Sequence, residues 1–399
     1  MITVTSDLQR WRLPDGVEEI LPESAKRLEH LRRAITDLHF SYGFDLVMPP
    51  MIEFLDSLLT GSGEFLDLQT FKLVDQLSGR TMGVRADMTP QVARIDGHRL
   101  DGETINRLFY LGTVLRTKPE QAGGTRTPLQ FGAELYGHKG IESDLEIIHL
   151  MLDTLDLVKI PELTLDLGHV GVYRALVQYA GLAEDAEAKL FNALQRKSMP
   201  EITDLLASWD ITTQSRVMLE ALPELNGDVT MLAHAREVLG DAGTAVTDCL
   251  DTLQDIHAAL HQRSSMINLH FDLAELRGYS YHTGVLFAAY ADGASEELAR
   301  GGRYDDIGAA FGQARAATGY SADLKQLAKL QADESPNELQ QSIFVETPTA
   351  PGASEAMADL RKQNIRVVAQ LPGSGLTPAS TGCTGQLVNR QNQWVVESV

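Results

Sequence analysis

Two short stretches of the chain combine residue types that suit a site for a small zwitterion. Residues 276–284 read Leu-Arg-Gly-Tyr-Ser-Tyr-His-Thr-Gly, and residues 301–305 read Gly-Gly-Arg-Tyr-Asp. Arg277 offers a guanidinium that can bind a carboxylate through two parallel hydrogen bonds, and Tyr281 and Tyr304 offer hydroxyl groups beside glycines that leave room for a ligand. Taken singly, such residues are more often a surface arginine, a core tyrosine or a turn glycine. Their joint occurrence indicates a binding site.

A predicted pair of strands supplies a polar floor for this site. Residues 107–116 and 127–137 have strand character and are joined by the polar loop 118–124. Because side chains alternate across a strand, Gln130 and Glu134 fall on one face, and the apolar residues between them fall on the other. The apolar face is expected to be core. Gln130 and Glu134 are therefore expected to point the same way.

Composition narrows the possible partners. A chain of 399 residues that is 43% hydrophobic can form one large domain with one or two smaller ones. Its 34 Lys and Arg against 55 Asp and Glu give a net charge of -21, which disfavours a dedicated nucleic-acid binder. Cys249 and Cys383 stand apart from any metal-binding pattern, so neither a disulfide framework nor a metal site is expected. Without a long apolar run or a signal peptide, we expect a cytoplasmic protein with no membrane partner.

Apolar spacing divides the chain into three parts. The predicted domains are a core at residues 1–330, a linker at 331–341 and a small C-terminal α/β unit at 342–399. Helical spacing is expected over residues 23–40, and again through residues 171–263 as a helical insertion within the core.

Strand character returns after the predicted insertion. Residues 267–273, 279–290 and 297–304 are expected to form an antiparallel meander. A shorter hairpin is expected near the start of the core, with residues 71–74 and 80–85 as its strands.

The order of these stretches resembles class II aminoacyl-tRNA synthetases, and histidyl-tRNA synthetases in particular. Residues 44–50 resemble motif 1, the dimer-interface segment, residues 108–137 resemble motif 2, and residues 319–327 stand where motif 3 belongs. Residues 85–89 are similar to the Arg-Pro-Glu-Gly-Thr loop of that family, and residues 276–284 are similar to its histidine signature. The resemblance implies an α+β fold, in which an antiparallel sheet is flanked by helices, with a helical insertion and a small C-terminal unit.

The resemblance also implies contacts to each end of free histidine. Asp87, Thr89 and Gln130 would hold its ammonium group, while Arg277 would take its carboxylate. Its imidazole would meet Glu134 and the Tyr281–His282 region. The full set of implied histidine-binding residues is Asp87, Thr89, Arg116, Gln130, Glu134, Arg277, Tyr281, His282 and Tyr304.

One difficulty concerns the register of this signature. On a regular strand Arg277 and His282 face opposite sides, so both reach a ligand only if the backbone is irregular near Gly278.

Residues that hold ATP in the synthetases are altered in this chain. Arg116 remains from motif 2, but Lys118 stands where an acid belongs, and Gln326 stands at the motif 3 arginine. A neutral amide does not replace a guanidinium stacked on adenine. The C-terminal unit is also shorter than an anticodon-binding domain and offers few cations. We therefore expect no catalytic residues, no cofactor and no nucleic-acid partner.

A protein that binds histidine without activating it is a sensor, and the chain resembles the regulatory subunits of ATP phosphoribosyltransferase. The resemblance implies a homodimer formed through the motif 1 region. It also implies a hetero-oligomer with the short catalytic subunit of the first step of L-histidine biosynthesis, which the chain would activate and subject to feedback inhibition by histidine. Two alternatives remain at this point: a working histidyl-tRNA synthetase, and a histidine-binding paralogue that serves another complex.

Overall fold

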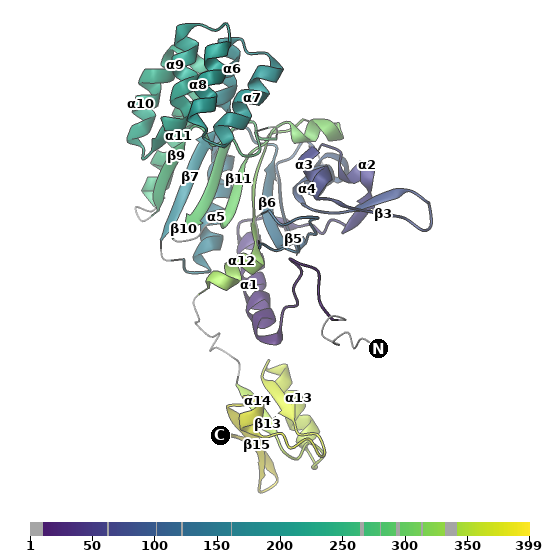
Figure 1. Cartoon of the computed structure of the whole chain (residues 1–399). Helices are drawn as coiled ribbons and strands as arrows, with labels where there is room; N and C mark the ends of the chain where they lie inside the picture. Colours follow the sequence, from purple (N-terminus) through teal and green to yellow (C-terminus); the bar gives the residue numbers. More distant parts are fainter. Residues whose placement is uncertain are drawn as a thin grey trace, which may run out of the picture. The chain divides into compact units, whose positions relative to one another are not determined.

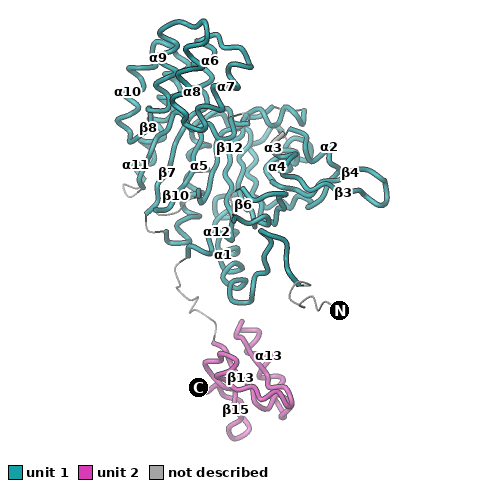
Figure 2. Tube along the Cα trace, in the orientation of Figure 1, with its two compact units in different colours: residues 1–332 teal, residues 333–399 magenta. Residues whose placement is uncertain are grey.

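The computed structural model divides into two compact units, residues 1–332 and residues 333–399 (Figure 2). It describes residues 11–61, 64–100, 102–120, 123–160, 162–263, 267–279, 281–292, 296–312, 314–331 and 341–399.

A mixed sheet forms the centre of the first unit (Figure 1). Within the described residues it has nine strands, in the order β1-β5-β6-β12-β11-β10-β7-β9-β8. β1 runs parallel to β5 and β7 runs parallel to β9, while the other neighbours are antiparallel. The strands are β1 (Asp45–Leu46), β5 (Asn106–Thr113), β6 (Leu129–Tyr136), β7 (Leu163–His169), β8 (Asn226–Gly227), β9 (Asn268–Asp272), β10 (Val285–Ala291), β11 (Ala299–Arg303) and β12 (Ala317–Asp323).

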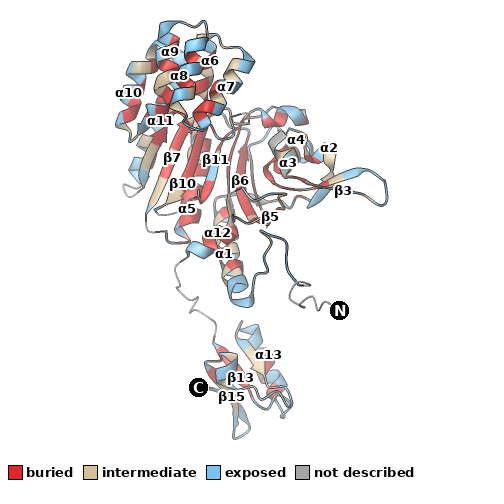
Figure 3. Ribbon diagram, in the orientation of Figure 1, coloured by how far each residue is buried: buried red, intermediate tan, exposed pale blue. Residues whose placement is uncertain are grey.

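Helices cover both faces of this sheet, so most of its strand residues are buried (Figure 3). On one face α5 packs against β6 and β12, and α1 packs against α5 and α12. Phe131, Ala133 and Leu135 of β6 join the large core on that face. On the other face α4 packs against β6 and η4. The bounds are α1 (Pro22–Ser41), α4 (Thr89–Arg99), α5 (Ile141–Asp156), α12 (Leu324–Leu330) and the 3-10 helix η4 (Ile307–Phe311).

A run of helices separates β7 from β9 along the chain and gathers at one end of the sheet (Figure 1). We call residues 170–263 the helical segment. The last of its helices shows why it folds: five apolar side chains at three- and four-residue spacing are all buried, namely Val246, Leu250, Leu253, Ile256 and Leu260. The helices are α6 (Val170–Ala180), α7 (Glu184–Gln195), α8 (Met199–Ser208), α9 (Thr213–Ala221), α10 (Thr230–Leu239) and α11 (Thr244–Arg263), with short 3-10 turns η2 (Leu222–Glu224) and η3 (Gly240–Ala242).

A smaller sheet lies beside the central one, with β4 between β2 and β3. Its β3–β4 pair confirms the predicted hairpin, as α1 confirms the predicted first helix. The elements are β2 (Ile52–Phe54), α2 (Leu55–Leu58), α3 (Glu64–Gln69), β3 (Phe71–Val74) and β4 (Thr81–Val84).

The predicted meander is confirmed in its second half and wrong in two other respects. β10 and β11 are antiparallel neighbours, as predicted, but β7 lies between β9 and β10, and β9 pairs with it in parallel. β10 begins only at Val285, because the residues before it form turns around Gly278, whose φ is +68°. Such a backbone angle favours glycine and interrupts a strand. The backbone is therefore irregular at Gly278, which is the condition that ligand contact by both Arg277 and His282 would require.

The second unit is a small α/β sandwich of its own. Its four strands lie in the order β14-β13-β15-β16, and Ile343, Val345, Met357 and Leu387 form its core in the part of the unit that is described. Its elements are β13 (Ser342–Val345), α13 (Ala353–Lys362), β14 (Arg366–Ala369), α14 (Pro378–Thr381), β15 (Gly385–Arg390) and β16 (Gln393–Ser398). In neither unit do the described residues include a helix long and apolar enough to cross a membrane.

Candidate ligand-binding pocket

A buried carboxylate, Glu134, is the central group of the pocket. It lies on β6, is 2% exposed, and accepts hydrogen bonds from the hydroxyls of Tyr110 (3.0 Å to Oε1) and Tyr304 (to Oε2). Burial raises the pKa of Glu134 to about 8, even though both hydroxyl bonds favour the charged form. The carboxyl group is therefore mostly neutral at pH 7, and a cationic ligand would draw it into the charged form.

A second acid, Asp87, lies in the turn before α4 and is tied to the same strand. The Gln130 amide donates to Asp87 Oδ1 at 2.7 Å and accepts from the backbone N–H of Met88 at 3.1 Å. The Thr89 hydroxyl lies 3.0 Å from the Tyr110 hydroxyl, which itself bonds Glu134. The two acids thus belong to one connected polar network, with an acceptor at each end.

Tyr281 closes the pocket from the signature segment. Its ring stacks on Tyr304 with centroids 5.0 Å apart and an interplanar angle of 19°. Its hydroxyl is buried and has no hydrogen-bond partner among the described residues. Burial and the nearby Glu134 raise the pKa of Tyr281 well above its usual value, so the hydroxyl remains a neutral donor. A buried polar atom without a partner is costly, and a polar ligand would satisfy it.

His282 packs edge-on against Tyr281, with centroids 5.0 Å apart. Its Nδ1 lies 3.2 Å from the carbonyl oxygen of Gly278, and burial lowers the pKa of His282 to about 4. A Cβ at Gly302 would lie 2.7 Å from His282 Cδ2, so a glycine is needed there. His282 is a neutral wall residue rather than a cation.

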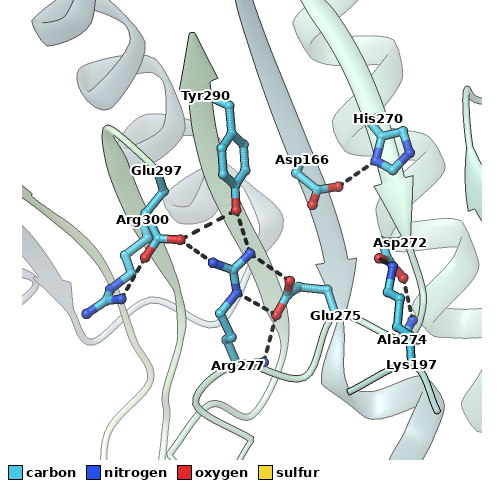
Figure 4. Close-up of polar contacts among 10 residues, drawn as sticks. All are labelled: Asp166, Lys197, His270, Asp272, Ala274, Glu275, Arg277, Tyr290, Glu297 and Arg300. Atoms are coloured by element: carbon cyan, nitrogen blue, oxygen red, sulfur yellow. Dashed lines mark hydrogen bonds and ion pairs between the residues drawn. The ribbon is translucent and has the colours of Figure 1, made fainter. Parts of the chain in front are cut away.

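Arg277 lies in a network of acids (Figure 4). Its guanidinium forms a bidentate pair with Glu275 (3.0 and 2.8 Å) and a second pair with Glu297, and it also donates to the Tyr290 hydroxyl. Its side chain is 49% exposed, and hydrogen bonding to Glu275 raises its pKa. The structure therefore connects Asp87, Thr89, Gln130, Glu134, Tyr281, His282 and Tyr304 by hydrogen bonds and ring contacts. The side-chain contacts described for Arg277 are instead with Glu275, Glu297 and Tyr290.

Arg116 lines a cleft that adjoins the pocket at Gln130. Its guanidinium lies 2.8 Å from Glu120, and Glu120 in turn lies 3.0 Å from Arg300. Burial opposes the charge of Glu120, but the two guanidinium groups hold its pKa below its usual value. Acids of the protein itself therefore neutralise the cations of this cleft.

Two positions that depart from the synthetase pattern lie in or near the same cleft. Gln326 lines it and donates to the backbone carbonyl of Glu297 at 3.1 Å, whereas Lys118 is exposed. Arg300 pairs with Glu297 at 2.6 Å. Together with the pairs of Arg277, these contacts form an alternating ladder of three arginines and three glutamates: Arg116, Glu120, Arg300, Glu297, Arg277 and Glu275.

Sequence reasoning missed Tyr110, which joins Thr89 to Glu134. The signal was present, because the alternation that places Glu134 on one face of β6 also places Tyr110 on that face of β5, opposite Gly132. Glu120 and Glu297 were missed for a different reason: each joins an arginine nearby in the chain to one further away, Arg300 for Glu120 and Arg277 for Glu297. Glu275, two residues before Arg277, was within reach of sequence reasoning and was also missed.

Comparisons with family models and with known proteins agree on the family of this chain. The model described as histidyl-tRNA synthetase matches residues 16–327, and the model described as ATP phosphoribosyltransferase subunit HisZ C-terminal domain matches residues 340–397. The regulatory subunit of ATP phosphoribosyltransferase from Thioalkalivibrio sulfidiphilus is 52% identical over 98% of this chain and 99% of that relative. The chain belongs to the ATP phosphoribosyltransferase regulatory subunits. The Nitrosococcus oceani regulatory subunit, 49% identical over 97% of both chains, is a further member.

Solved structures confirm the predicted fold of this regulatory subunit. A protein described as ATP phosphoribosyltransferase regulatory subunit/histidyl-tRNA synthetase from Bacillus halodurans superposes with a TM-score of 0.80 at 26% identity, over 93% of this chain and 96% of that chain. Histidyl-tRNA synthetase from Nostoc superposes with a TM-score of 0.77 at 16% identity, over 97% of both chains. The class II synthetase-like prediction is therefore correct, and the chain is a regulatory rather than a catalytic subunit.

Proposed function

We propose that this regulatory subunit binds free L-histidine in the Glu134 pocket and transmits its presence to the short catalytic subunit of ATP phosphoribosyltransferase. The observation that carries the proposal is the pairing of a buried acid with an unsatisfied hydroxyl: Glu134 has a pKa near 8, and the hydroxyl of Tyr281 is buried without a partner in the described part of the chain. The imidazole of histidine has two ring nitrogens, so one can pair with the Glu134 carboxyl group and the other with the Tyr281 hydroxyl.

The other end of histidine would meet the acid at the opposite end of the network. An ammonium group needs acceptors, and Asp87 and the Thr89 hydroxyl provide them, with Gln130 fixing the orientation of Asp87. The carboxylate of histidine could pair with Arg277 only by displacing Glu275 or Glu297 from it. Otherwise it would lie near Arg116. Acids of the protein would therefore compete with the ligand carboxylate for Arg277.

Self-association through the motif 1 region is supported by exposed apolar side chains on and near it. Met48 is 80% exposed, and Met51 and Ile52, which follow it closely in the chain, are 47% and 46% exposed. Single exposed apolar residues are common, but a group of this kind is typical of a protein interface. We propose a homodimer that buries these side chains.

The remaining assignments follow from the family and from the sequence. We propose a synthetase-like core at residues 1–330 with residues 171–263 inserted in it, a linker at 331–341 and a truncated C-terminal unit at 342–399. The protein would work in the cytoplasm as part of a hetero-oligomer with the catalytic subunit, without nucleic acid. Activation chemistry is disfavoured because acids of the chain pair with the cleft arginines.

The test is an ATP phosphoribosyltransferase assay with the short catalytic subunit, with and without this chain, titrated with histidine. We expect the chain to raise the rate and histidine to suppress it. Formation of no complex and no change in rate would favour a histidine-binding protein that serves another assembly. Histidine-dependent ATP–pyrophosphate exchange by the purified chain would instead identify a working synthetase.

A further inference from the structure

The signature segment is attached to the helical segment through Tyr279. The Tyr279 ring lies 5.1 Å from the ring of Tyr173 on α6 and 5.3 Å from that of Phe191 on α7, measured between centroids. Its hydroxyl donates to Glu187 Oε1 at 2.5 Å. Tyr279 is thus packed among α6 and α7, whereas Tyr281, two residues later, packs on Tyr304 in the pocket.

Arg174 on α6 holds the backbone on both sides of Tyr281. Its Nη2 donates to the carbonyl oxygens of Tyr279 at 3.0 Å and His282 at 2.8 Å. Its guanidinium also lies over the Tyr279 ring, 4.9 Å from the centroid. The two carbonyl groups bracket the residue whose hydroxyl lacks a partner, so a shift of Tyr281 changes the distance from Arg174 to at least one of them.

A third tether joins the end of the signature to the start of α6. The backbone N–H of Val170 donates to the carbonyl of Gly284 at 3.1 Å. The described residues between Gly278 and Gly284 form turns outside the sheet, and Thr283 ties them to β11 and beyond: its N–H donates to the carbonyl of Arg303 at 2.7 Å, and its hydroxyl accepts from the N–H of Asp305 at 2.9 Å. The position of the segment therefore depends on α6 and α7 as well as on this end of β11.

We propose that Arg174 is a positioning residue for the pocket and that, through Arg174 and Tyr279, ligand binding at Tyr281 is transmitted to α6 and α7. The inference rests on the proposed function, since it takes histidine as the ligand. Satisfying the Tyr281 hydroxyl fixes the turn, the fixed turn holds its two carbonyl groups against Arg174, and α6 and α7 become more rigid. Ligand binding in the pocket thereby changes the rigidity of the helical segment, outside the pocket itself.

The experiment measures backbone hydrogen exchange of the full-length chain with and without saturating histidine, alongside calorimetric histidine affinity. In the wild type, histidine is expected to slow exchange in residues 170–195. In Arg174→Ala, histidine is expected to bind about tenfold more weakly, within the usual range of coupling between sites, and at saturation to leave exchange in α6 and α7 unchanged. The matched control is Arg196→Ala, since Arg196 lies at the end of α7 and, among the described residues, its ion pair is with Glu201 on the surface.

The possible results distinguish failure of this inference from failure of the proposed function. Absence of histidine binding by the wild type contradicts the proposed function. Binding without slower exchange in residues 170–195 overturns the inference alone, as does full retention of the effect in Arg174→Ala. Should Arg174→Ala fail to fold, Tyr279→Phe carries the test, because it keeps the ring and removes the hydroxyl that bonds Glu187. It is expected to reduce the protection of α7, and undiminished protection there would overturn the inference.

Discussion

Gly319 lies directly opposite Glu134 in the β12–β6 pair, and a Cβ at Gly319 would stand 1.7 Å from Glu134 Oε2. The carboxylate therefore occupies the space that a side chain on the neighbouring strand would need. Any other residue at this position forces Glu134, or the strand that carries it, to move.

Gly319→Ala is expected to weaken histidine binding and to lower the free energy of unfolding by about 1–3 kcal/mol, the usual cost of overpacking a core. The matched control is Gly240→Ala, because a Cβ at Gly240 meets no atom within 4 Å and its backbone is already helical. Chemical denaturation and calorimetry measure the two effects. Wild-type affinity in Gly319→Ala would place the ligand away from Glu134.

The pH dependence of histidine affinity provides a second prediction. Free imidazole has a pKa of about 6.5, and the pKa of Glu134 is about 8. Between these values a neutral carboxyl and a neutral imidazole can form a charged pair by internal proton transfer, without exchange with solvent. Affinity is expected to be highest in this window, with a proton released at lower pH and taken up at higher pH.

Calorimetry in buffers of different ionisation enthalpy measures these protons directly. In Glu134→Gln the proton release on the acid side is expected to disappear, since the amide has no proton to give up to a charged ligand. Proton release that persists in Glu134→Gln would assign the coupling to another group.

Stability of the ligand-free chain should depend on pH through the same residue. The pKa of Glu134 in the folded state lies above the usual 4.5, so the folded chain binds the proton more tightly than the unfolded chain. The stability from this proton is fully present below pH 4.5 and is lost as the pH rises toward about 8, by up to ~1.4 kcal/mol per pH unit. Denaturation of the wild type and of Glu134→Gln across this range should diverge, and parallel curves would refute the assignment.

Competition for Arg277 gives the last prediction. If the ligand carboxylate displaces an acid from Arg277, Glu297→Gln should tighten histidine binding and Arg277→Ala should weaken it by about 1–3 kcal/mol. Calorimetric titration of both variants measures this. Equal affinity in all three proteins would leave the carboxylate to Arg116 or to backbone donors. Arg390→Ala, in the second unit, is a control that removes an exposed ion pair with Glu397.

The polar floor of the pocket could be predicted because alternation along a strand is a local property. Gln130 and Glu134 share a face of β6 whatever the rest of the fold does. The position of Arg277 could not be predicted in this way. Glu275 and Glu297 compete for it from a turn and from the residues before β11, and a sequence pattern does not measure that competition.

The signature segment shows the same limit for the backbone. Its residue types indicate strand, but Gly278 takes a left-handed angle, and the turn is held from outside by Arg174. Local propensity is overridden here by contacts with a helix about a hundred residues earlier in the chain.

The ladder of alternating charges in the cleft bears on how readily this family could regain synthetase chemistry. Restoring an arginine at position 326 would add a third guanidinium to a cleft whose two lining arginines, Arg116 and Arg300, already pair with Glu120 and Glu297. The carboxylates of Glu120 and Glu297 would remain in the cleft and would repel a nucleotide phosphate there. Gln326→Arg alone is therefore not expected to restore a nucleotide site in this cleft.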